Sequence, residues 1–257
     1  MAYSEYDGEF YFGNGDGIPT SLTSIGQDIW RSDALRLKVL KLPNNDMRMT
    51  YDNGTTIYFR PIVLGYQTVM YRPYVMSDRN GNTLQLTWNN DDQLETVLDE
   101  LGRAITFSYN AQGKLIRVEE PAGRKVVFDY DTHRNIQRIT VHHAGDTKYT
   151  EFTYSSGFPA TQDYLNHNML TIVDSKGQTY VTNTYNSDDE VSQQIYGGDT
   201  YSYDYTHNAQ GGIIGVDVTN GRGVETEYTM SNGLVTRRAR TTMIGGTEVY
   251  TMAYNTE

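Results

Sequence analysis

Two acidic clusters are the residues whose types and spacing could most readily do chemistry. Asp91-Asp92 stands shortly before Leu94, and Asp188-Asp189-Glu190 stands directly before Val191. Paired carboxylates can act as acid and base in glycoside hydrolysis. The alternative is that each cluster is a turn, where adjacent acids face water. We favour the turns, so the sequence predicts no catalytic residues and no enzyme.

The histidines are the second group that could do chemistry, as metal ligands. His142 and His143 are neighbours, and on a strand they would point to opposite faces and could not easily share an ion. His133, His167 and His207 are scattered, and the chain has no cysteine to complete a zinc set. We therefore predict no metal site among them.

A faint calcium signal lies near the N-terminus, at Asn14-Gly15-Asp16-Gly17. A calcium loop needs several oxygen ligands around one ion, but Tyr11 and Phe12 stand where more of them would be wanted, so a hairpin turn is favoured. The chain also has no Gly-x-Ser-x-Gly motif and no glycine-rich phosphate loop with Lys-Ser/Thr. We predict no cofactor.

Composition excludes further classes of function. The chain has 257 residues, 32 acidic against 21 basic, and a formal charge of −11. This charge disfavours binding to nucleic acid, which needs a clustered positive surface. The sequence has no run of about 18 apolar residues, so no transmembrane helix is predicted. The small basic group Arg237, Arg238 and Arg240 is best explained as a solvated strand, with Arg238 and Arg240 on one face. The N-terminus lacks the pattern of a signal peptide.

The elements that must position all these residues are repeated hairpins. One phrase occurs twice in register, with offsets of 6, 9, 14, 19 and 21 from its first residue. The first copy is Trp88, Leu94, Val97, Gly102, Phe107 and Tyr109; the second is Tyr109, Leu115, Val118, Gly123, Phe128 and Tyr130. Such a period is the mark of a repeat architecture.

Each copy reads as two short strands. Residues 115–118 and 125–130 are rich in β-branched and aromatic types, and Gly, Asn, Asp and Pro separate them. Gly102 and Gly123 recur because tight turns often need positive φ. Before the repeat, residues 32–42 are predicted to form a strand, because their apolar residues alternate. Residues 47–51 and 55–59 flank the turn Asp52-Asn53-Gly54 as a hairpin. With 22 Tyr against 7 Phe, a deep oily core is not expected.

The phrase resembles the YD repeat of RHS (rearrangement hot spot) proteins, which bacterial toxin-complex shell proteins and teneurins share. The matching residues in this sequence are Tyr109-Asn110, Gly113, Leu115, Val118, Gly123-Arg124, Phe128 and Tyr130-Asp131. The resemblance is tight over residues 76–140 and looser towards the C-terminus. It implies an all-β fold, in which antiparallel hairpins form a spiralling, curved sheet that is part of a shell. Residues 1–70 would be a β-rich lead-in or capping segment, and residues 71–257 the repeat array.

The resemblance also implies the function that we expect. The chain would be a non-enzymatic segment of a shell that encapsulates a toxin or effector domain. Its partners would be neighbouring repeats of a longer parent protein and an enclosed toxin domain, at an extracellular or cell-surface location. No Asp-Pro dipeptide is present, so the family's self-cleavage is not carried over. The alternative is a module that binds carbohydrate or a cell-surface glycan through the Tyr-rich strand that holds Tyr201, Tyr203 and Tyr205.

Overall fold

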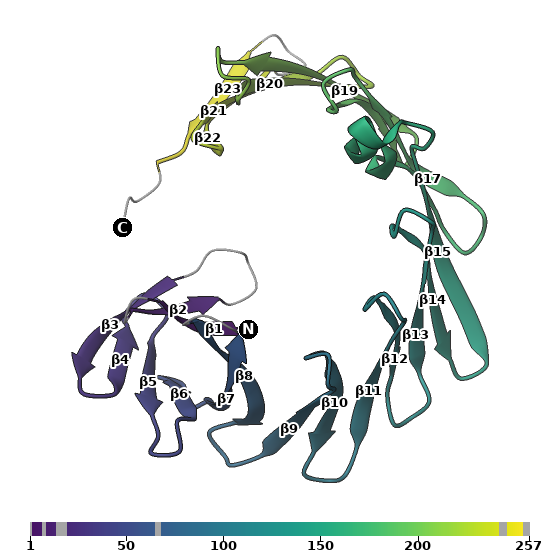
Figure 1. Cartoon of the computed structure of the whole chain (residues 1–257). Coiled ribbons are helices and arrows are strands. Elements are labelled where there is room, and N and C mark those ends of the chain that lie inside the picture. Colours follow the sequence, from purple (N-terminus) through teal and green to yellow (C-terminus); the bar gives the residue numbers. More distant parts are fainter. Residues whose placement is uncertain (1, 7–8, 14–19, 65–67, 242–245, 254–257) are drawn as a thin grey trace. The chain divides into compact units, whose positions relative to one another are not determined.

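The computed structural model is all-β, as the sequence predicts (Figure 1). It describes residues 2–6, 9–13, 20–64, 68–241 and 246–253, and only the backbone of those before residue 21 and of residues 63–64 and 68–69. The described residues form 23 strands, and every pairing given below is antiparallel. The chain divides into two compact units, Met1–Val126 and Val127–Glu257, which are described separately. The expectation of an antiparallel hairpin array is confirmed.

The first eight strands close into a ring. Each strand from β1 to β8 pairs with the next, and β1 also pairs with β8 through Tyr3 and Tyr71. The strands are β1 (Ala2–Tyr6), β2 (Glu9–Gly13), β3 (Thr20–Gly26), β4 (Ile29–Ser32), β5 (Leu37–Lys41), β6 (Met47–Tyr51), β7 (Thr56–Leu64) and β8 (Thr68–Ser77). The strand predicted over residues 32–42 is wrong in its first part, because residues 33–36 form a turn between β4 and β5. The predicted alternation is seen in β5, where Leu37 and Val39 are buried and Lys38 is exposed. The candidate calcium loop at residues 14–17 lies outside the described residues.

The ring holds an apolar core, which the sequence analysis did not expect. Its buried side chains come from alternate positions of several strands: Leu22, Leu37, Val39, Met47, Met49, Ile57, Phe59 and Tyr71. In the rest of the described chain, buried hydrophobic residues are few: Val181, Val224 and Ala239. The expectation was wrong because the composition is an average over the whole chain. It combines a closed ring, which has an interior, with an open array, which has none.

Strand β8 is the branch point between the ring and the array. One edge pairs with β7 along its length. The other edge is shared, with Val69 to Tyr71 pairing with β1 and Val75 to Ser77 pairing with β9 (Thr83–Trp88). The boundary predicted near residue 70 therefore falls within a continuous strand.

The array of the first unit continues with β10 (Leu94–Asp99), β11 (Ala104–Tyr109) and β12 (Leu115–Glu119), and β13 (Lys125–Tyr130) lies at the unit boundary. Its two faces differ in chemistry. Leu86, Val97 and Ile105 occupy paired positions on one face, while the threonines of a ladder, Thr87, Thr96 and Thr106, occupy the other. These strands pack mainly against their hydrogen-bonded neighbours, so the apolar side chains stay half-exposed.

The second unit is a run of ten strands: β14 (Ile136–His143), β15 (Asp146–Tyr154), β16 (Met169–Val173), β17 (Thr179–Tyr185), β18 (Val191–Tyr196), β19 (Asp199–His207), β20 (Ile213–Asn220), β21 (Glu225–Ser231), β22 (Leu234–Thr241) and β23 (Thr247–Thr251). Each pairs with the next. Between β15 and β16 lies a 3₁₀ helix, η1 (Ala160–His167). Within the described residues, no helix has the length and apolar character needed to cross a membrane.

Candidate functional site

A five-residue turn is the local unit on which the hairpins are built. In the turn from Asn110 to Lys114, Asn110 Oδ1 accepts hydrogen bonds from the amides of Gln112 at 3.0 Å and Lys114 at 2.9 Å. The fourth residue, Gly113, has φ +75°. The same pair of side-chain hydrogen bonds recurs at Asp78, Asn89, Asp99, Asp131, Asp174, Asn186, Asn208 and Asn220. An Asx side chain that mimics a backbone turn explains the Asp or Asn of the repeat.

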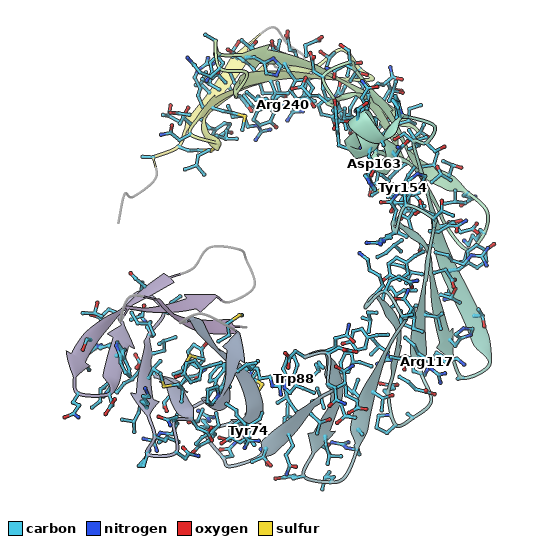
Figure 2. The ribbon with its side chains drawn as sticks, viewed as in Figure 1. Tyr74, Trp88, Arg117, Tyr154, Asp163 and Arg240 are labelled. Atoms are coloured by element: carbon cyan, nitrogen blue, oxygen red, sulfur yellow. The ribbon has the colours of Figure 1, made fainter. Side chains whose placement is uncertain are left out.

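The tyrosine that precedes this turn has its own recurring contact. Tyr109 donates its hydroxyl to the carbonyl oxygen of Leu94 at 2.8 Å. Strand pairing between β10 and β11 ends at Thr96 and Thr106. The phenol therefore donates a hydrogen bond to a carbonyl oxygen, that of Leu94, which lies beyond the end of the ladder. The equivalent bonds join Tyr154 to Ile136, Tyr185 to Met169 and Tyr205 to Val191, at 2.9 to 3.0 Å. At the first copy Trp88 donates Nε1–H to Pro73 O at 2.8 Å (Figure 2).

The remaining repeat residues lie on the same elements. Trp88 ends β9, Phe107 and Tyr109 lie on β11, and Phe128 and Tyr130 on β13. The aliphatic members Leu94, Val97, Leu115 and Val118 lie on β10 and β12. Gly102 and Gly123 occupy the fourth turn position with φ +78° and +84°. All these residues therefore lie in the strands and turns that form the hairpins.

The acidic clusters both lie in these turns. Asp92 has φ +59° and forms an ion pair with Arg72. Asp189 has φ +67° and accepts a hydrogen bond from the side chain of Asn168. Thus Asp92 and Asp189 hold the position that glycine holds in neighbouring turns.

Glu190 is held by two neighbours. Its carboxylate accepts from Asn186 Nδ2 at 2.9 Å and lies 2.7 Å from His207 Nε2. This contact joins two successive turns of the second unit, since His207 directly precedes the turn that Asn208 begins. The contact between Glu190 and His207 therefore links two turns and has a structural role.

The structure brings together two histidines that are distant in sequence. The rings of His133 and His167 meet edge to face, with centroids 6.2 Å apart. His167 comes from η1, and its Nδ1 lies 2.8 Å from Asn135 Oδ1. No spacing in the sequence predicts this contact, because it depends on how the η1 segment folds back. Elsewhere His142 and His143 alternate along β14, and the described residues contain no cluster of three His, Asp or Glu side chains able to hold a metal.

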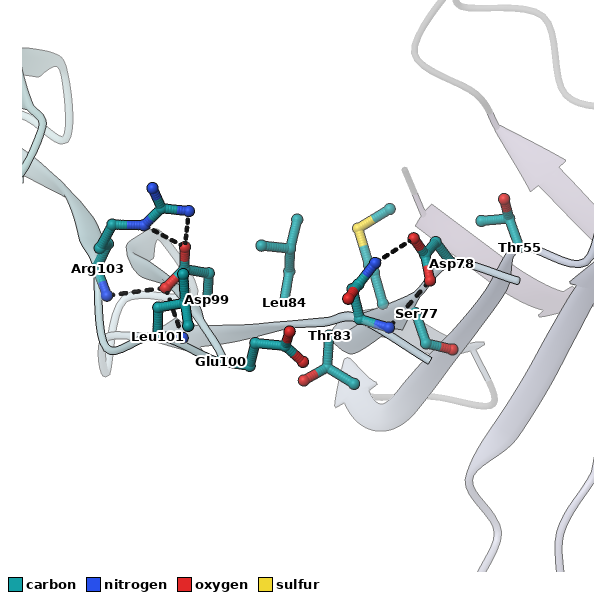
Figure 3. A pocket seen from close by; sticks show the side chains of 11 residues that line it. Thr55, Ser77, Asp78, Thr83, Leu84, Asp99, Glu100, Leu101 and Arg103 are labelled. Carbon is teal, nitrogen blue, oxygen red and sulfur yellow. Dashed lines mark hydrogen bonds and ion pairs between the residues drawn. The ribbon is translucent and has the colours of Figure 1, made fainter. Parts of the chain in front are cut away.

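A cavity of the first unit lies where the ring meets the array (Figure 3). It has a volume of about 530 Å³, and its lining includes Leu84, between the turns that Asp78 and Asp99 begin. The side-chain amide of Asn82 is the main cause that lowers the pKa of Asp78, and hydrogen bonds from the amide and guanidinium of Arg103 lower that of Asp99. Both carboxylates are therefore stabilised in their ionised form, which does not suit a general acid.

The three tyrosines proposed as ligand-binding residues share one face of β19 and are half-buried. The hydroxyl of Tyr205 is engaged with Val191, as in other repeats. Burial raises the pKa of Tyr203, with smaller contributions from Tyr201 and Tyr228. Tyr201 lines a polar depression of about 200 Å³ whose other walls include Asp199, Asn220, Arg222 and Arg240.

Comparison with known proteins identifies the repeated unit. The family model described as "RHS Repeat" matches residues 88–125 and again residues 109–148. Residues 88–148 contain RHS repeats. The match falls on the turns and tyrosines described above, so the resemblance inferred from the sequence is confirmed over this stretch. The same Asx-turn geometry recurs beyond this stretch, in the turns that Asp174, Asn186, Asn208 and Asn220 begin.

The solved structures that match this chain are distant from it. The structure of the Photorhabdus luminescens Tc holotoxin pore is 10% identical, with a TM-score of 0.46, over 96% of this chain and 16% of that one. TcdB2-TccC3 without its hypervariable C-terminal region is 10% identical, with a TM-score of 0.37, over 93% and 15%. A porin-like protein from Bacteroides uniformis is 13% identical, with a TM-score of 0.31, over 96% and 93%.

The chain thus spans about a sixth of the length of the first of these structures. No curated protein matches the sequence. The assignment to RHS repeats rests on the repeat match and on the hairpin geometry.

Proposed function

We propose that the chain is a non-enzymatic structural segment of an RHS-type shell, of the kind that encapsulates a toxin or effector domain. The observation that carries this proposal is the open array of repeat hairpins, with an apolar face that the described residues leave half-exposed. Leu86, Val97 and Ile105 are paired on that face. A single-layered sheet of this kind can form one wall of an enclosure, where further repeats and enclosed polypeptide complete the burial.

Several parts of this proposal concern the molecule as a whole. Residues 1–70 would be a lead-in or capping segment, and residues 71–257 the YD-repeat array. Neighbouring repeats of a longer parent protein and an enclosed toxin domain would be the partners. The location would be extracellular or at the cell surface, in keeping with shells that deliver a toxin.

Scattering from the isolated chain tests the shell proposal. A compact globular protein of this length would have a radius of gyration of about 18 Å. We expect small-angle scattering to give a clearly larger value, and light scattering on a sizing column to show association through strand edges as the concentration rises. A compact monomer at every concentration would contradict the proposal.

Carbohydrate binding is the second candidate function, favoured by the polar depression beside Tyr201. An aromatic side chain with polar neighbours such as Asp199 and Asn220 offers the stacking surface and hydrogen-bonding groups that a sugar needs. A glycan array would test it. Binding that Tyr201→Ala abolishes and Tyr196→Ala preserves would support this function, and the absence of any bound glycan would count against it.

A further inference from the structure

One face of the second unit carries a row of aromatic side chains around an arginine. Strand pairing places Tyr205, Val216, Tyr228, Arg238 and Tyr250 at directly opposed positions across β19 to β23. Directly opposed residues of antiparallel strands point to the same face. The guanidinium carbon of Arg238 lies 5.8 Å from the centre of the Tyr250 ring. Arg238 therefore lies between Tyr228 and Tyr250 in this row.

Arg238 differs from the other half-buried arginines of the described chain because it has no ion pair. The others are paired, Arg72 with Asp92, Arg117 with Glu119 and Arg237 with Glu227. The Nε–H group of Arg238 is buried and has no hydrogen-bond partner among the described residues. A buried donor on a cation that lacks an acceptor is costly, and an incoming carboxylate would relieve that cost.

Three acids of β19 to β21 lie on the face of the sheet away from Arg238, whereas Asp199, at the start of β19, lies on the same face as Tyr205. Asp204, Asp217 and Glu227 are opposed to one another across β19 to β21, on the face that points away from Arg238. On the Arg238 face the next row contains Arg240, opposed to the exposed Glu248. Neither Arg238 nor Arg240 forms an ion pair within the described ranges. In a chain of formal charge −11, these two arginines without ion pairs offer an incoming carboxylate a place to bind.

We propose that the face formed by Tyr205, Val216, Tyr228, Arg238 and Tyr250, here named the Arg238 face, docks an acidic polypeptide segment. A carboxylate of that segment would accept hydrogen bonds from Arg238, and its apolar side chains would pack on the tyrosines and valine. The row offers few hydrogen-bonding groups between its rings, so it fits a polypeptide that alternates acidic and apolar residues better than a sugar. This inference stands apart from the shell proposal, because it concerns one face of this chain only.

Fluorescence anisotropy with the whole chain tests the proposal. The probe is a labelled synthetic peptide in which Glu alternates with Leu, and the comparison peptides replace Glu by Gln or by Lys. We expect binding of the Glu peptide that weakens as salt is added, and weaker binding of the other two. Arg238→Gln should weaken binding of the Glu peptide roughly tenfold or more, and Arg238→Lys should restore part of it.

Arg237→Gln is the matched control. It makes the same charge change on the same strand, but Arg237 points to the other face, where it pairs with Glu227 at 2.7 Å. Equal weakening by Arg237→Gln and Arg238→Gln would overturn the proposal, as would no binding of the Glu peptide or equal binding of the Gln peptide. Arg238-dependent binding of a polyuronate in place of the peptide would overturn the choice of a polypeptide. If Arg238→Gln does not fold, Tyr250→Ala replaces it, because Tyr250 is an exposed member of the same face. Unchanged binding of the Glu peptide by that variant would overturn the proposal.

Discussion

At the scale of single residues, the repeat tyrosine acts through its hydroxyl group. The phenol of Tyr109 reaches the carbonyl of Leu94, which lies beyond the end of the ladder between β10 and β11. A half-buried carbonyl without a partner would weaken the edge of each hairpin pair. Phenylalanine at this position would keep the ring and lose the hydrogen bond.

We therefore predict that Tyr109→Phe lowers the free energy of unfolding by about 1 kcal/mol. Urea denaturation followed by circular dichroism would measure it. The control is Tyr196→Phe, because Tyr196 is 56% exposed and the same loss of a hydroxyl should there change little. Equal effects of the two substitutions would show that the bond to Leu94 contributes nothing.

At the scale of elements, the fourth position of each turn decides how easily the hairpin forms. Gly102 has φ +78°, and an added Cβ there would meet nothing within 4 Å. Arg134 holds the equivalent position in another turn with φ +69°. The left-handed conformation costs a residue with a Cβ about 1 kcal/mol or more, and glycine adopts it freely.

For these two turns we predict changes in the free energy of unfolding that have opposite signs. Gly102→Ala should destabilise the chain by about 1 kcal/mol through backbone strain alone, and Arg134→Gly should stabilise it by up to about 1 kcal/mol. The midpoints of urea unfolding would show shifts in opposite directions. Shifts of the same sign would mean that side-chain contacts, and not backbone conformation, dominate at this turn position.

At the scale of the whole molecule, the half-buried phenols should set the alkaline limit of stability. Burial is the largest cause that raises the pKa of several tyrosines in both units: Tyr51, Tyr74, Tyr109, Tyr130, Tyr154, Tyr185, Tyr203 and Tyr205. The unfolded chain would release these protons first, near pH 10. Because the unfolded state then binds fewer protons, stability falls as the pH rises.

We predict that urea midpoints are nearly constant below about pH 9 and fall steeply as the pH passes about 10 and then the raised pKa values of the folded state. The near-ultraviolet absorbance of tyrosinate, measured in parallel, should show part of the tyrosines ionising only as the chain unfolds. A midpoint that stays constant while every tyrosine titrates would contradict this explanation.

The sequence by itself determined the hairpin array. The spacing from Trp88 to Tyr130 records a local rule, in which an Asx turn, a left-handed residue and a tyrosine recur with each pair of strands. Local rules of this kind involve residues close in the chain, so they can be read without knowing the fold. The alternation that places Arg238 and Arg240 on one face is local in the same way.

Only the tertiary structure decided the features that join distant parts of the chain. The pairing of Tyr3 with Tyr71 closes the ring and creates an interior for Met49 and Phe59. The meeting of His133 with His167 depends on the path of η1. The lack of an ion pair at Arg238 depends on which face each acid of β19 to β21 takes. Such contacts carry no period in the sequence, because many different residues can satisfy them and the chain between their members varies in length.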